Sequence, residues 1–591
     1  MKELEYPFDG ALIIKKKKSL KRRLLAEKTN FTPLRVAILG GQTTNDIKNV
    51  LDVFLLNYGI KADFYESEYN MYYEDGMFDN PELEKFAPEI IYVCTCIRNI
   101  SSFPEMTDSP QDAAAKLSDV YKRFEGLWEH LSAKYNCPII QNNFEYPYYR
   151  LMGNKDASSI NGRVNFVTRL NLKFADYADS HKNFYINDIN YQSASYGLES
   201  WSDPYYWHMY KYAVTVAAIP YLSFNIANII KSLLGKNKKV LMLDMDNTLW
   251  GGVIGDDGAD NIEIGQETSI SQTYSEFQSY VKAHKDLGIL LAINSKNDRE
   301  TAVKGLERPD SVLREDDFVS MKINWEPKSS NLAAAANELN LLPESFVFVD
   351  DNPAEREIIR QNLPNTAVPE IGNQAERYIN ILDKSGFFEL TNYSKDDAAR
   401  NEMYKANARR TEALSSFSNY KDYLLSLEMK GEIQSFIPAW MSRIAQLTNK
   451  SNQFNLTTKR YTQTEIEAVA SDDNYITLYG KLSDKFGDNG VVSVAIGRIE
   501  DNTCHIELWI MSCRVLKRDM EYAMMDSFVE KCRKRNLKII KGYYYPTAKN
   551  AMVKDFYSLH GFEKISEDGN GNSEWLLKIA DYKNKNDVIS L

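Results

Sequence analysis

The segment from Lys239 to Gly258, KVLMLDMDNTLWGGVIGDDG, decides the fold of the chain. Residues 240–243 form a continuous apolar run, which is typical of a strand buried on both faces of a parallel sheet. Directly after this run come Asp244 and Asp246, two residues apart. Ligands of open α/β sheets bind beyond the carboxyl ends of the strands, so both carboxylates are predicted to reach one small polar site. Such a pair is costly unless a cation or a phosphoryl group requires it.

Two later segments repeat this pattern of a buried strand that ends in polar residues. Residues 289–293 and 346–349 are apolar runs of strand length, and a helix is predicted over residues 330–340. The polar residues beside these elements are Asn294, Ser295, Lys296, Lys328, Asp350 and Asp351. Because the carboxyl ends of parallel strands meet at one edge of a sheet, these side chains are predicted to converge.

The negative charge gathered at this edge predicts a divalent cation. A phosphate ester brings about two negative charges, and the carboxylates of Asp244, Asp246, Asp350 and Asp351 add to them. Two like charges about 4 Å apart repel by about 4 kcal/mol at an effective dielectric constant of about 20. They coexist with a bound substrate only if cations intervene, and the sequence itself supplies Lys328. Oxygen ligands of this kind favour Mg²⁺.

The run Asp244-Met245-Asp246-Asn247-Thr248 resembles DxDxT, the first motif of the haloacid dehalogenase (HAD) superfamily of phosphotransferases. Its continuation through Gly258 is similar to the FkbH-like branch, HAD subfamily IIIC. The resemblance implies that Asp244 is the nucleophile and forms an aspartyl-phosphate. It also implies that Asp246 is the general acid for the leaving oxygen and then the base for the incoming water.

The same resemblance implies roles for the remaining residues. Ser295 would donate to a phosphoryl oxygen and Lys328 would neutralise its charge. The expected Mg²⁺ ligands are Asp244, Asp246 (through its backbone carbonyl), Asp350 and Asp351. The expected substrate contacts are Thr248, which also orients the nucleophile loop, Asn294, Lys296 and Trp250. The sequence leaves two positions open for the Trp250 side chain: it either packs under a flap or faces the substrate. The flap, residues 250–265, is the one insertion for which the spacing leaves room, so the site is predicted to be capless.

The length of the chain, 591 residues, predicts several domains rather than a single core. The expected fold class is multidomain α/β, with a HAD-type Rossmannoid parallel sheet flanked by an SGNH-hydrolase-like α/β domain and a GNAT-like α+β domain. The predicted divisions are a basic lead-in (1–32), the SGNH-hydrolase-like domain (33–235), the phosphatase domain (236–385), a helical linker (386–427) and the GNAT-like domain (428–580), followed by a mobile tail.

The N-terminal domain is predicted to be non-catalytic. Gly40-Gly41-Gln42-Thr43 stands where an active SGNH hydrolase would place its Gly-Asp-Ser nucleophile block, and Asp203 and His208 do not have the Asp-x-x-His spacing. Before it, the basic run KKKKSLKRR (residues 15–23) is interpreted as a solvated, helical lead-in. Leu20, Leu24 and Leu25 are expected to dock it on the next domain.

The C-terminal domain has strands predicted at residues 475–479, 491–498 and 504–512. Acyltransferases of the GNAT fold cradle a CoA pyrophosphate on a glycine-rich loop that opens a helix, a favourable anion site. The equivalent loop here, residues 514–519, has no glycine and carries Asp519, which disfavours CoA binding. Lys517 and Arg518 remain candidates for contact with a phosphate or phosphopantetheine group.

Composition narrows the class of partners. The net charge of −11 and the pI near 5.4 disfavour nucleic acid as a partner. Residues 212–230 carry no charge, but Pro220 and two asparagines make a membrane span unexpected. The N-terminus has no apolar signal-peptide region, and the six cysteines, with Cys94 and Cys96 as a buried thiol pair, suggest a reducing cytoplasm.

These observations predict a Mg²⁺-dependent phosphohydrolase or phosphotransferase that acts on a phosphorylated metabolite, by analogy in surface-polysaccharide or secondary metabolism. A second candidate activity is glyceryl transfer from 1,3-bisphosphoglycerate to an acyl carrier protein, which would then be a partner. Members with that activity often have a cysteine between the motif aspartates, where this chain has Met245, and residues 236–385 contain no cysteine. A GNAT-type acyltransferase and an assembly protein with a relic phosphatase core are the third and fourth candidates.

Overall fold

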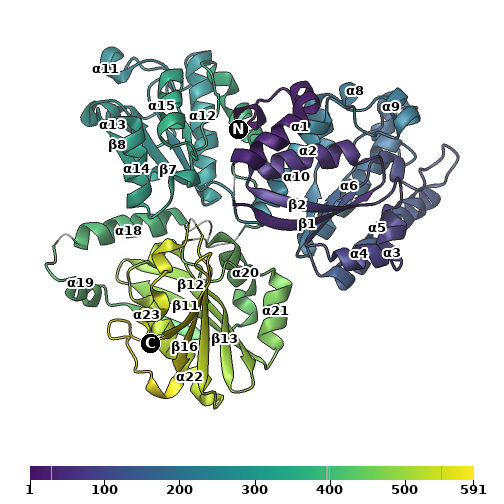
Figure 1. Ribbon diagram of the computed structural model, residues 1–591. Coiled ribbons are helices and arrows are strands. Elements are labelled where there is room, and N and C mark those ends of the chain that lie inside the picture. Colours follow the sequence, from purple (N-terminus) through teal and green to yellow (C-terminus); the bar gives the residue numbers. More distant parts are fainter. Residues whose placement is uncertain (28–29, 394–396, 398–399, 415, 452, 548) are drawn as a thin grey trace. The chain divides into compact units, whose positions relative to one another are not determined.

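The computed structural model describes residues 1–27, 30–393, 397, 400–414, 416–451, 453–547 and 549–591. These residues form two compact units, Met1–Leu233 and Leu234–Leu591 (Figure 1). The first unit holds a five-stranded sheet, and the second holds a four-stranded and a seven-stranded sheet. The prediction of a multidomain α/β chain is therefore confirmed, whereas the finer domain boundaries stay predictions.

The first unit is built on a parallel sheet with strand order β2-β1-β3-β4-β5. Its strands are β1 (Thr32–Gly40), β2 (Ile60–Glu66), β3 (Ile90–Cys94), β4 (Ile139–Asn142) and β5 (Phe184–Asn187). Its helices are α1 (Gly10–Glu27), α2 (Asn45–Asn57), α3 (Tyr72–Met77), α4 (Pro81–Phe86), α5 (Pro110–Tyr135), α6 (Arg163–Ser180), α7 (Ile189–Tyr196), α8 (Leu198–Trp201), α9 (Pro204–Tyr210) and α10 (Ile219–Leu233).

The basic lead-in is the helix α1, as expected, and three of its seven basic side chains form ion pairs. Lys17 and Lys21 form ion pairs of 2.7 and 2.6 Å with carboxylates of α2. Leu20 and Leu24 are buried, whereas Leu25 is 41% exposed, so the docking predicted for Leu25 is wrong. Leu20 and Leu24 lie four residues apart and so share one face of the helix, which Leu25, the next residue in the chain, does not.

The second unit begins with the parallel sheet predicted from the opening segment, in the order β8-β7-β6-β9. Its strands are β6 (Val240–Leu243), β7 (Leu290–Ser295), β8 (Ser320–Ile323) and β9 (Phe346–Val349). Its helices are α11 (Ile254–Asp257), α12 (Ser269–Asp286), α13 (Arg299–Glu307), α14 (Lys328–Glu338), α15 (Pro353–Asn362) and α16 (Tyr378–Lys384). All four residues of β6 are fully buried, as a strand with neighbours on both faces requires.

The remainder of the second unit is a mixed sheet with helices. Its strands are β10 (Lys430–Gln434), β11 (Tyr475–Asp484), β12 (Gly487–Glu500), β13 (Thr503–Met511), β14 (Ile539–Tyr544), β15 (Glu563–Glu567) and β16 (Ser573–Lys578). Its helices are α18 (Arg400–Leu414), α19 (Tyr420–Ser426), α20 (Met441–Lys450), α21 (Gln463–Ser471), α22 (Met520–Lys534) and α23 (Phe556–Leu559). Neighbouring strands are antiparallel except for the pair β13 and β14.

The C-terminal residues are packed, so the prediction of a mobile tail is wrong. Val588 and Ile589 are 9% and 5% exposed. The backbone of Ser590 bonds to Gly431 and Met429 at 2.7 and 3.0 Å, beside the edge strand β10. Two apolar residues within the polar tail sequence therefore anchor it, and the tail covers an edge that would otherwise be free.

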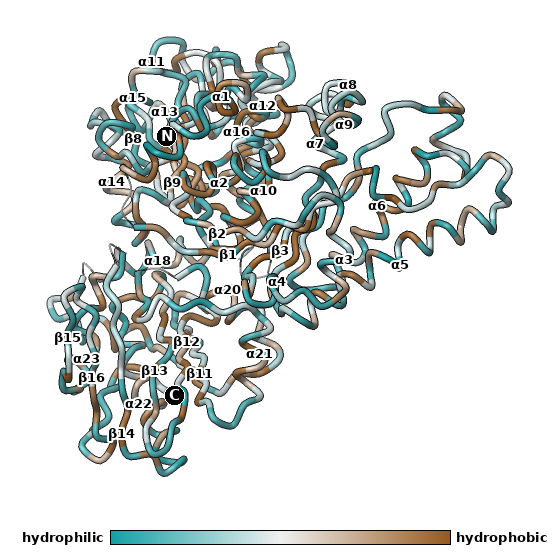
Figure 2. The backbone as a smooth tube through the Cα atoms, turned by 45° about the vertical axis from the view of Figure 1, so that its right-hand side comes forward, coloured by the Kyte–Doolittle hydropathy of each residue, from teal (hydrophilic) through white to brown (hydrophobic). Residues whose placement is uncertain are grey.

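Hydrophobic residues follow the strands of the sheets, as the brown stretches of Figure 2 show for β1 and β3. All six cysteines are free, and Cys94 and Cys96 are buried. Among the described residues, no helix combines the length and the apolar character that crossing a membrane would require.

Candidate functional site

Two neighbouring strands of the four-stranded sheet bring the acidic motifs together. In the register of β6 and β9, Leu243 lies opposite Val349, so Asp244 and Asp350 follow at the same edge. The backbone N–H of Asp244 donates to the Val349 carbonyl at 2.9 Å, which fixes this alignment. Carboxylate oxygens of Asp244, Asp350 and Asp351 lie within 4.8 Å of one another. The convergence expected at this edge is thus present for three of the four aspartates.

Lys328 joins two of these carboxylates. Its ammonium nitrogen is 2.7 Å from Asp244 Oδ2 and 2.6 Å from Asp350 Oδ2, and the residue is 3% exposed. Burial lowers the pKa of Lys328, but the two aspartates outweigh it, so the pKa is raised. Lys328 therefore carries a positive charge between the carboxylates.

One lysine leaves the three carboxylates incompletely compensated. Burial, followed by repulsion from Asp244, raises the pKa of Asp350 to about 6, and the same two causes raise the pKa of Asp351. Asp244 Oδ1 is buried and has no hydrogen-bond partner. An unpartnered carboxylate oxygen beside two further carboxylates is the donor set of a hard divalent cation such as Mg²⁺. The residues present therefore fit the predicted metal.

Asp246 directs its side chain into the flap and is absent from this carboxylate group. Its Oδ1 accepts from the indole N–H of Trp250 at 2.9 Å and from the backbone of Ile254 at 3.1 Å. Its Oδ2 accepts from Asn297 at 2.9 Å. The pKa of Asp246 is raised, first by burial. Three donors thus hold Asp246 in one orientation, and a metal contact through its backbone carbonyl stays a prediction.

Three residues predicted to contact substrate are engaged elsewhere. Trp250 is fully buried and bonded to Asp246, so it packs beneath the flap rather than facing the substrate. Thr248, also fully buried, accepts from the backbone of Asp351 at 3.3 Å. The amide of Asn294 donates to the Lys328 carbonyl at 2.8 Å, which places the start of α14. These residues position the site, and their assignment as substrate contacts is corrected.

Ser295 and Lys296 stay candidates for substrate contact. Ser295 is the last residue of β7 and is 1% exposed. Its carbonyl accepts from Asn324 at 3.1 Å, which ties the strand to the segment before Lys328. The Lys296 ammonium is 2.7 Å from Glu355 Oε1, and its side chain is 37% exposed.

Three further residues at the site were missed by sequence reasoning. Asn297 holds Asp246, and Arg356 donates to the carbonyls of Asp350 and Asp351 at 2.7 Å each. Trp325, three residues before Lys328, is 74% exposed. Asn297 follows Ser295 in the same loop, which was a usable signal. Arg356 lies inside α15 and has no local signal in the sequence.

The flap is small and firmly attached. At its base, the backbones of Gly251 and Glu263 exchange hydrogen bonds of 3.1 and 2.8 Å. Its one helix is α11, and the space between β7 and β8 holds only α13 and a short 3-10 turn. Within the described residues 236–385, no cap domain covers the carboxylates.

The hydroxyl of the N-terminal motif belongs to Thr43, which is partly exposed and donates to the Tyr210 carbonyl at 2.8 Å. Gln42 is 3% exposed, and its side-chain carbonyl accepts from the backbone of Ala213 at 2.9 Å. Asp203 caps α9 by accepting from Tyr205 at 2.8 Å, whereas His208 is exposed. These side chains do not form the relay that a hydrolase of this type would need.

The loop before α22 is locked by internal contacts. Arg518 is 7% exposed and bonds to Asp484 at 3.2 Å and to the Arg514 carbonyl at 2.8 Å. The guanidinium of Arg518 already donates to groups within the protein, so the predicted contact of Arg518 with a phosphate group is wrong. Lys517 has a φ of +63°, and its role stays a prediction.

A chain segment also fills the gap between β13 and β14. These strands pair only through residues 503–505 and 539–541. Farther along, Leu456 donates to Trp509 at 3.2 Å, Phe454 accepts from Met511 at 3.1 Å, and Tyr545 donates to Leu456 at 2.9 Å. An extended ligand arm could enter between the two strands only by displacing residues 454–457.

Residues 35–231 match the model of the FkbH N-terminal domain. A solved structure of the N-terminal part of protein BF1531 from Bacteroides fragilis, which contains a phosphatase domain complexed with Mg, is 27% identical to the chain. The match covers 64% of this chain and 99% of that one, with a TM-score of 0.58. No curated protein sequence matches the chain.

Two further solved structures match a smaller part of the chain. The ribosomal-protein-S18-alanine N-acetyltransferase from Escherichia coli is 12% identical and covers 25% of this chain and 94% of its own, with a TM-score of 0.21. Ard1 from Thermoplasma volcanium is 18% identical and covers 25% and 97%, with a TM-score of 0.20. Similarity at this level carries no argument about activity.

Proposed function

We propose that residues 236–385 catalyse the Mg²⁺-dependent hydrolysis of a phosphate monoester through an aspartyl-phosphate on Asp244. The observation that carries the proposal is the buried group of Asp244, Asp350 and Asp351 bridged by Lys328, in which one oxygen of Asp244 has no partner. The similarity to a magnesium-complexed structure that contains a phosphatase domain supports it.

The metal would be held by Asp244, Asp350 and Asp351. When bound, Mg²⁺ supplies positive charge that offsets the charge of the phosphoryl group. The chain fixes the geometry of these ligands. Arg356 donates hydrogen bonds to the carbonyls of Asp350 and Asp351, and the backbone N–H of Asp244 donates to Val349 of β9. Ligands that are already in place require little reorganisation during the reaction.

The chemistry proceeds in two steps that conserve atoms and charge. Asp244 attacks phosphorus, the bond from phosphorus to the ester oxygen breaks, and Asp246 gives its proton to the departing oxygen. Water then attacks the aspartyl-phosphate, Asp246 recovers a proton from that water, and phosphate leaves as Asp244 is regenerated. The donors from Trp250, Ile254 and Asn297 hold Asp246 in place through both steps.

The open site favours a substrate that itself covers the reacting centre. Water must be limited around an acyl phosphate, and within the described residues 236–385 the flap is the one insertion available to cover this site. Trp325 offers a large, 74% exposed aromatic face close in sequence to Lys328, and Val253 on the flap is 38% exposed. We call Trp325 and Val253 the rim of the site, and we propose that the substrate carries an organic group that packs against this rim.

Glyceryl transfer and acyl transfer have less support. Glyceryl loading through a thioester in this domain would need a cysteine, and residues 236–385 have none. An acyltransferase would need access for an extended cofactor arm, and residues 454–457 occupy the gap between β13 and β14. A carrier-protein partner stays a prediction.

The test is phosphate release from p-nitrophenyl phosphate and from a panel of sugar phosphates, with Mg²⁺ and with EDTA. We expect release only with Mg²⁺, and loss of release in Asp244→Asn. Asp286→Asn, an exposed aspartate at the end of α12, is the matched control and should leave release unchanged. Release that persists in Asp244→Asn would refute the assignment of the nucleophile.

A further inference from the structure

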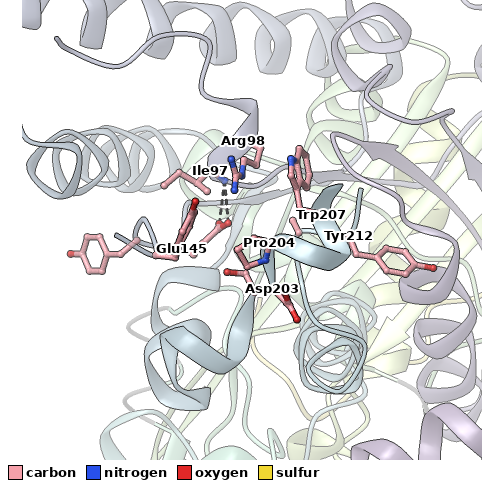
Figure 3. A pocket seen from close by; sticks show the side chains of 11 residues that line it. Ile97, Arg98, Glu145, Asp203, Pro204, Trp207 and Tyr212 are labelled. Carbon is pink, nitrogen blue, oxygen red and sulfur yellow. Dashed lines mark hydrogen bonds between the residues drawn. The ribbon is translucent and has the colours of Figure 1, made fainter. Parts of the chain in front are cut away.

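The first unit contains a cavity at the carboxyl edge of its own five-stranded sheet. It is a small hollow that is partly open to solvent, so a ligand bound there would extend out of it. Its walls come from the turn after β3, the loop after β4 and helix α9, and they include Arg98, Glu145, Tyr148 and Trp207 (Figure 3). Crevices at this edge of open α/β sheets are where ligands bind. The mix of aromatic walls and a few polar groups is typical of a small-molecule site.

Glu145 is the buried polar group of this cavity. It is 3% exposed, and both of its carboxylate oxygens accept from the same donor, the backbone N–H of Ile97, at 3.3 Å each (Figure 3). Burial raises the pKa of Glu145 to about 7. The backbone N–H of Glu145 itself also interacts with this carboxylate, which has about four acceptor positions, so part of its capacity to accept hydrogen bonds remains. Such a group is satisfied best by a donor that enters from the cavity, such as a hydroxyl.

Arg98 is the cationic group of the cavity, and aromatic rings hold it in place. Its guanidinium carbon lies 5.6 Å from the ring centre of Tyr148 and 5.4 Å from that of Trp207. Among the described residues, no acceptor forms a hydrogen bond or ion pair with this guanidinium, and the residue is exposed. A guanidinium that is fixed in position and still has its donors free matches the planar fork of an oxyanion.

We propose that this cavity binds a small hydroxylated oxyanion, whose carboxylate or phosphate pairs with Arg98 and whose hydroxyl groups bond to Glu145. A cationic ligand is disfavoured by Arg98, and a wholly apolar ligand would leave both polar groups unsatisfied. The proposal is binding without reaction, because Gln42 is bonded to Ala213, the Thr43 hydroxyl donates to the Tyr210 carbonyl, and Asp203 caps α9. The phosphatase proposal is not needed for this inference.

Calorimetric titration of the full-length chain, in EDTA to silence metal-dependent turnover, tests the proposal. Gluconate provides the anion and the hydroxyls, hexanoate provides the anion alone, and glucose provides hydroxyls alone. Gluconate is expected to bind at least about tenfold more tightly than either control, which corresponds to about 1.4 kcal/mol. Glucose 6-phosphate, compared with gluconate, shows whether the preferred anion is a phosphate or a carboxylate.

Variants then locate the binding. Arg98→Gln should weaken binding of the preferred anion at least about tenfold. Arg163→Gln is the matched control, because Arg163 also stacks on two rings, at 4.9 and 5.4 Å, but does not line the cavity. Glu145→Leu should abolish the preference for gluconate over hexanoate. If Arg98→Gln does not fold, this second variant alone tests whether the cavity is the binding site. The proposal would be overturned if neither gluconate nor glucose 6-phosphate bound the unmodified chain. It would also be overturned if binding were unchanged in Arg98→Gln and in Glu145→Leu.

Discussion

Replacing Lys328 with methionine tests the electrostatics of the carboxylate group. The substitution keeps the length of the side chain and removes the charge that bridges Asp244 and Asp350. At the 4.8 Å limit of the group, each pair of carboxylates repels by about 3.5 kcal/mol at an effective dielectric constant of about 20. Proton uptake limits the total, so we expect a loss of about 3–5 kcal/mol, as for other broken buried ion pairs.

Thermal unfolding of the full-length chain measures this loss. Without Mg²⁺, the transition of the second unit should fall by roughly 4–7 °C in Lys328→Met, and added Mg²⁺ should restore part of it, because the ion supplies the missing charge. Lys322→Met is the matched control. Its 2.7 Å ion pair with Glu338 is partly exposed, so its loss should cost at most about 1 kcal/mol. Equal shifts for both variants, with no response to Mg²⁺, would refute the reasoning.

Three further predictions concern single residues. Trp250→Phe removes a hydrogen bond to Asp246 while keeping an aromatic ring, so kcat for p-nitrophenyl phosphate should fall about tenfold with little change in KM; an unchanged kcat would contradict this role. Trp325→Ala should raise KM for the preferred sugar phosphate several-fold and leave Tm unchanged, because the ring is 74% exposed; equal KM values would remove Trp325 from the rim. Glu145 has a pKa raised by burial from 4.5 to about 7, so its stability contribution is present below about pH 4.5 and is lost as pH rises through about 7. Glu145→Gln should therefore gain up to about 3 kcal/mol over the unmodified chain between about pH 5 and about pH 8, and a difference in Tm that does not vary with pH would exclude this.

The location of the phosphatase-like site followed from the sequence because strand ends are a local property. Apolar runs ending in Asp244, Ser295 and Asp350 predict one edge of a parallel sheet, and these residues lie there. The direction of individual side chains was less accessible. Asn294 and Ser295 are neighbours on β7, and adjacent strand residues point to opposite faces. A polar residue at a strand end can thus support the site from behind, as Asn294 does.

Contacts between segments that are distant in the sequence explain the remaining differences between the predictions and the structure. The place of Trp250 depends on Asp246 and on the flap closing over both, which residue types alone do not specify. Arg518, in the loop before α22, bonds to Asp484 at the end of β11, which lies more than thirty residues earlier in the chain. The cavity of the first unit joins Arg98, Glu145 and Trp207 from three separate segments, and none of them belongs to a recognisable motif. Tertiary structure creates these sites without leaving a local pattern.

The measurement that tests the central claim most directly is mass spectrometry of the chain after acid quenching during turnover of p-nitrophenyl phosphate with Mg²⁺. A phosphoryl group should be found on the peptide that contains Asp244, and Asp244→Asn should yield neither this modified peptide nor free phosphate. Steady hydrolysis with no phosphorylated Asp244, or with the phosphoryl group on another residue, would contradict the account.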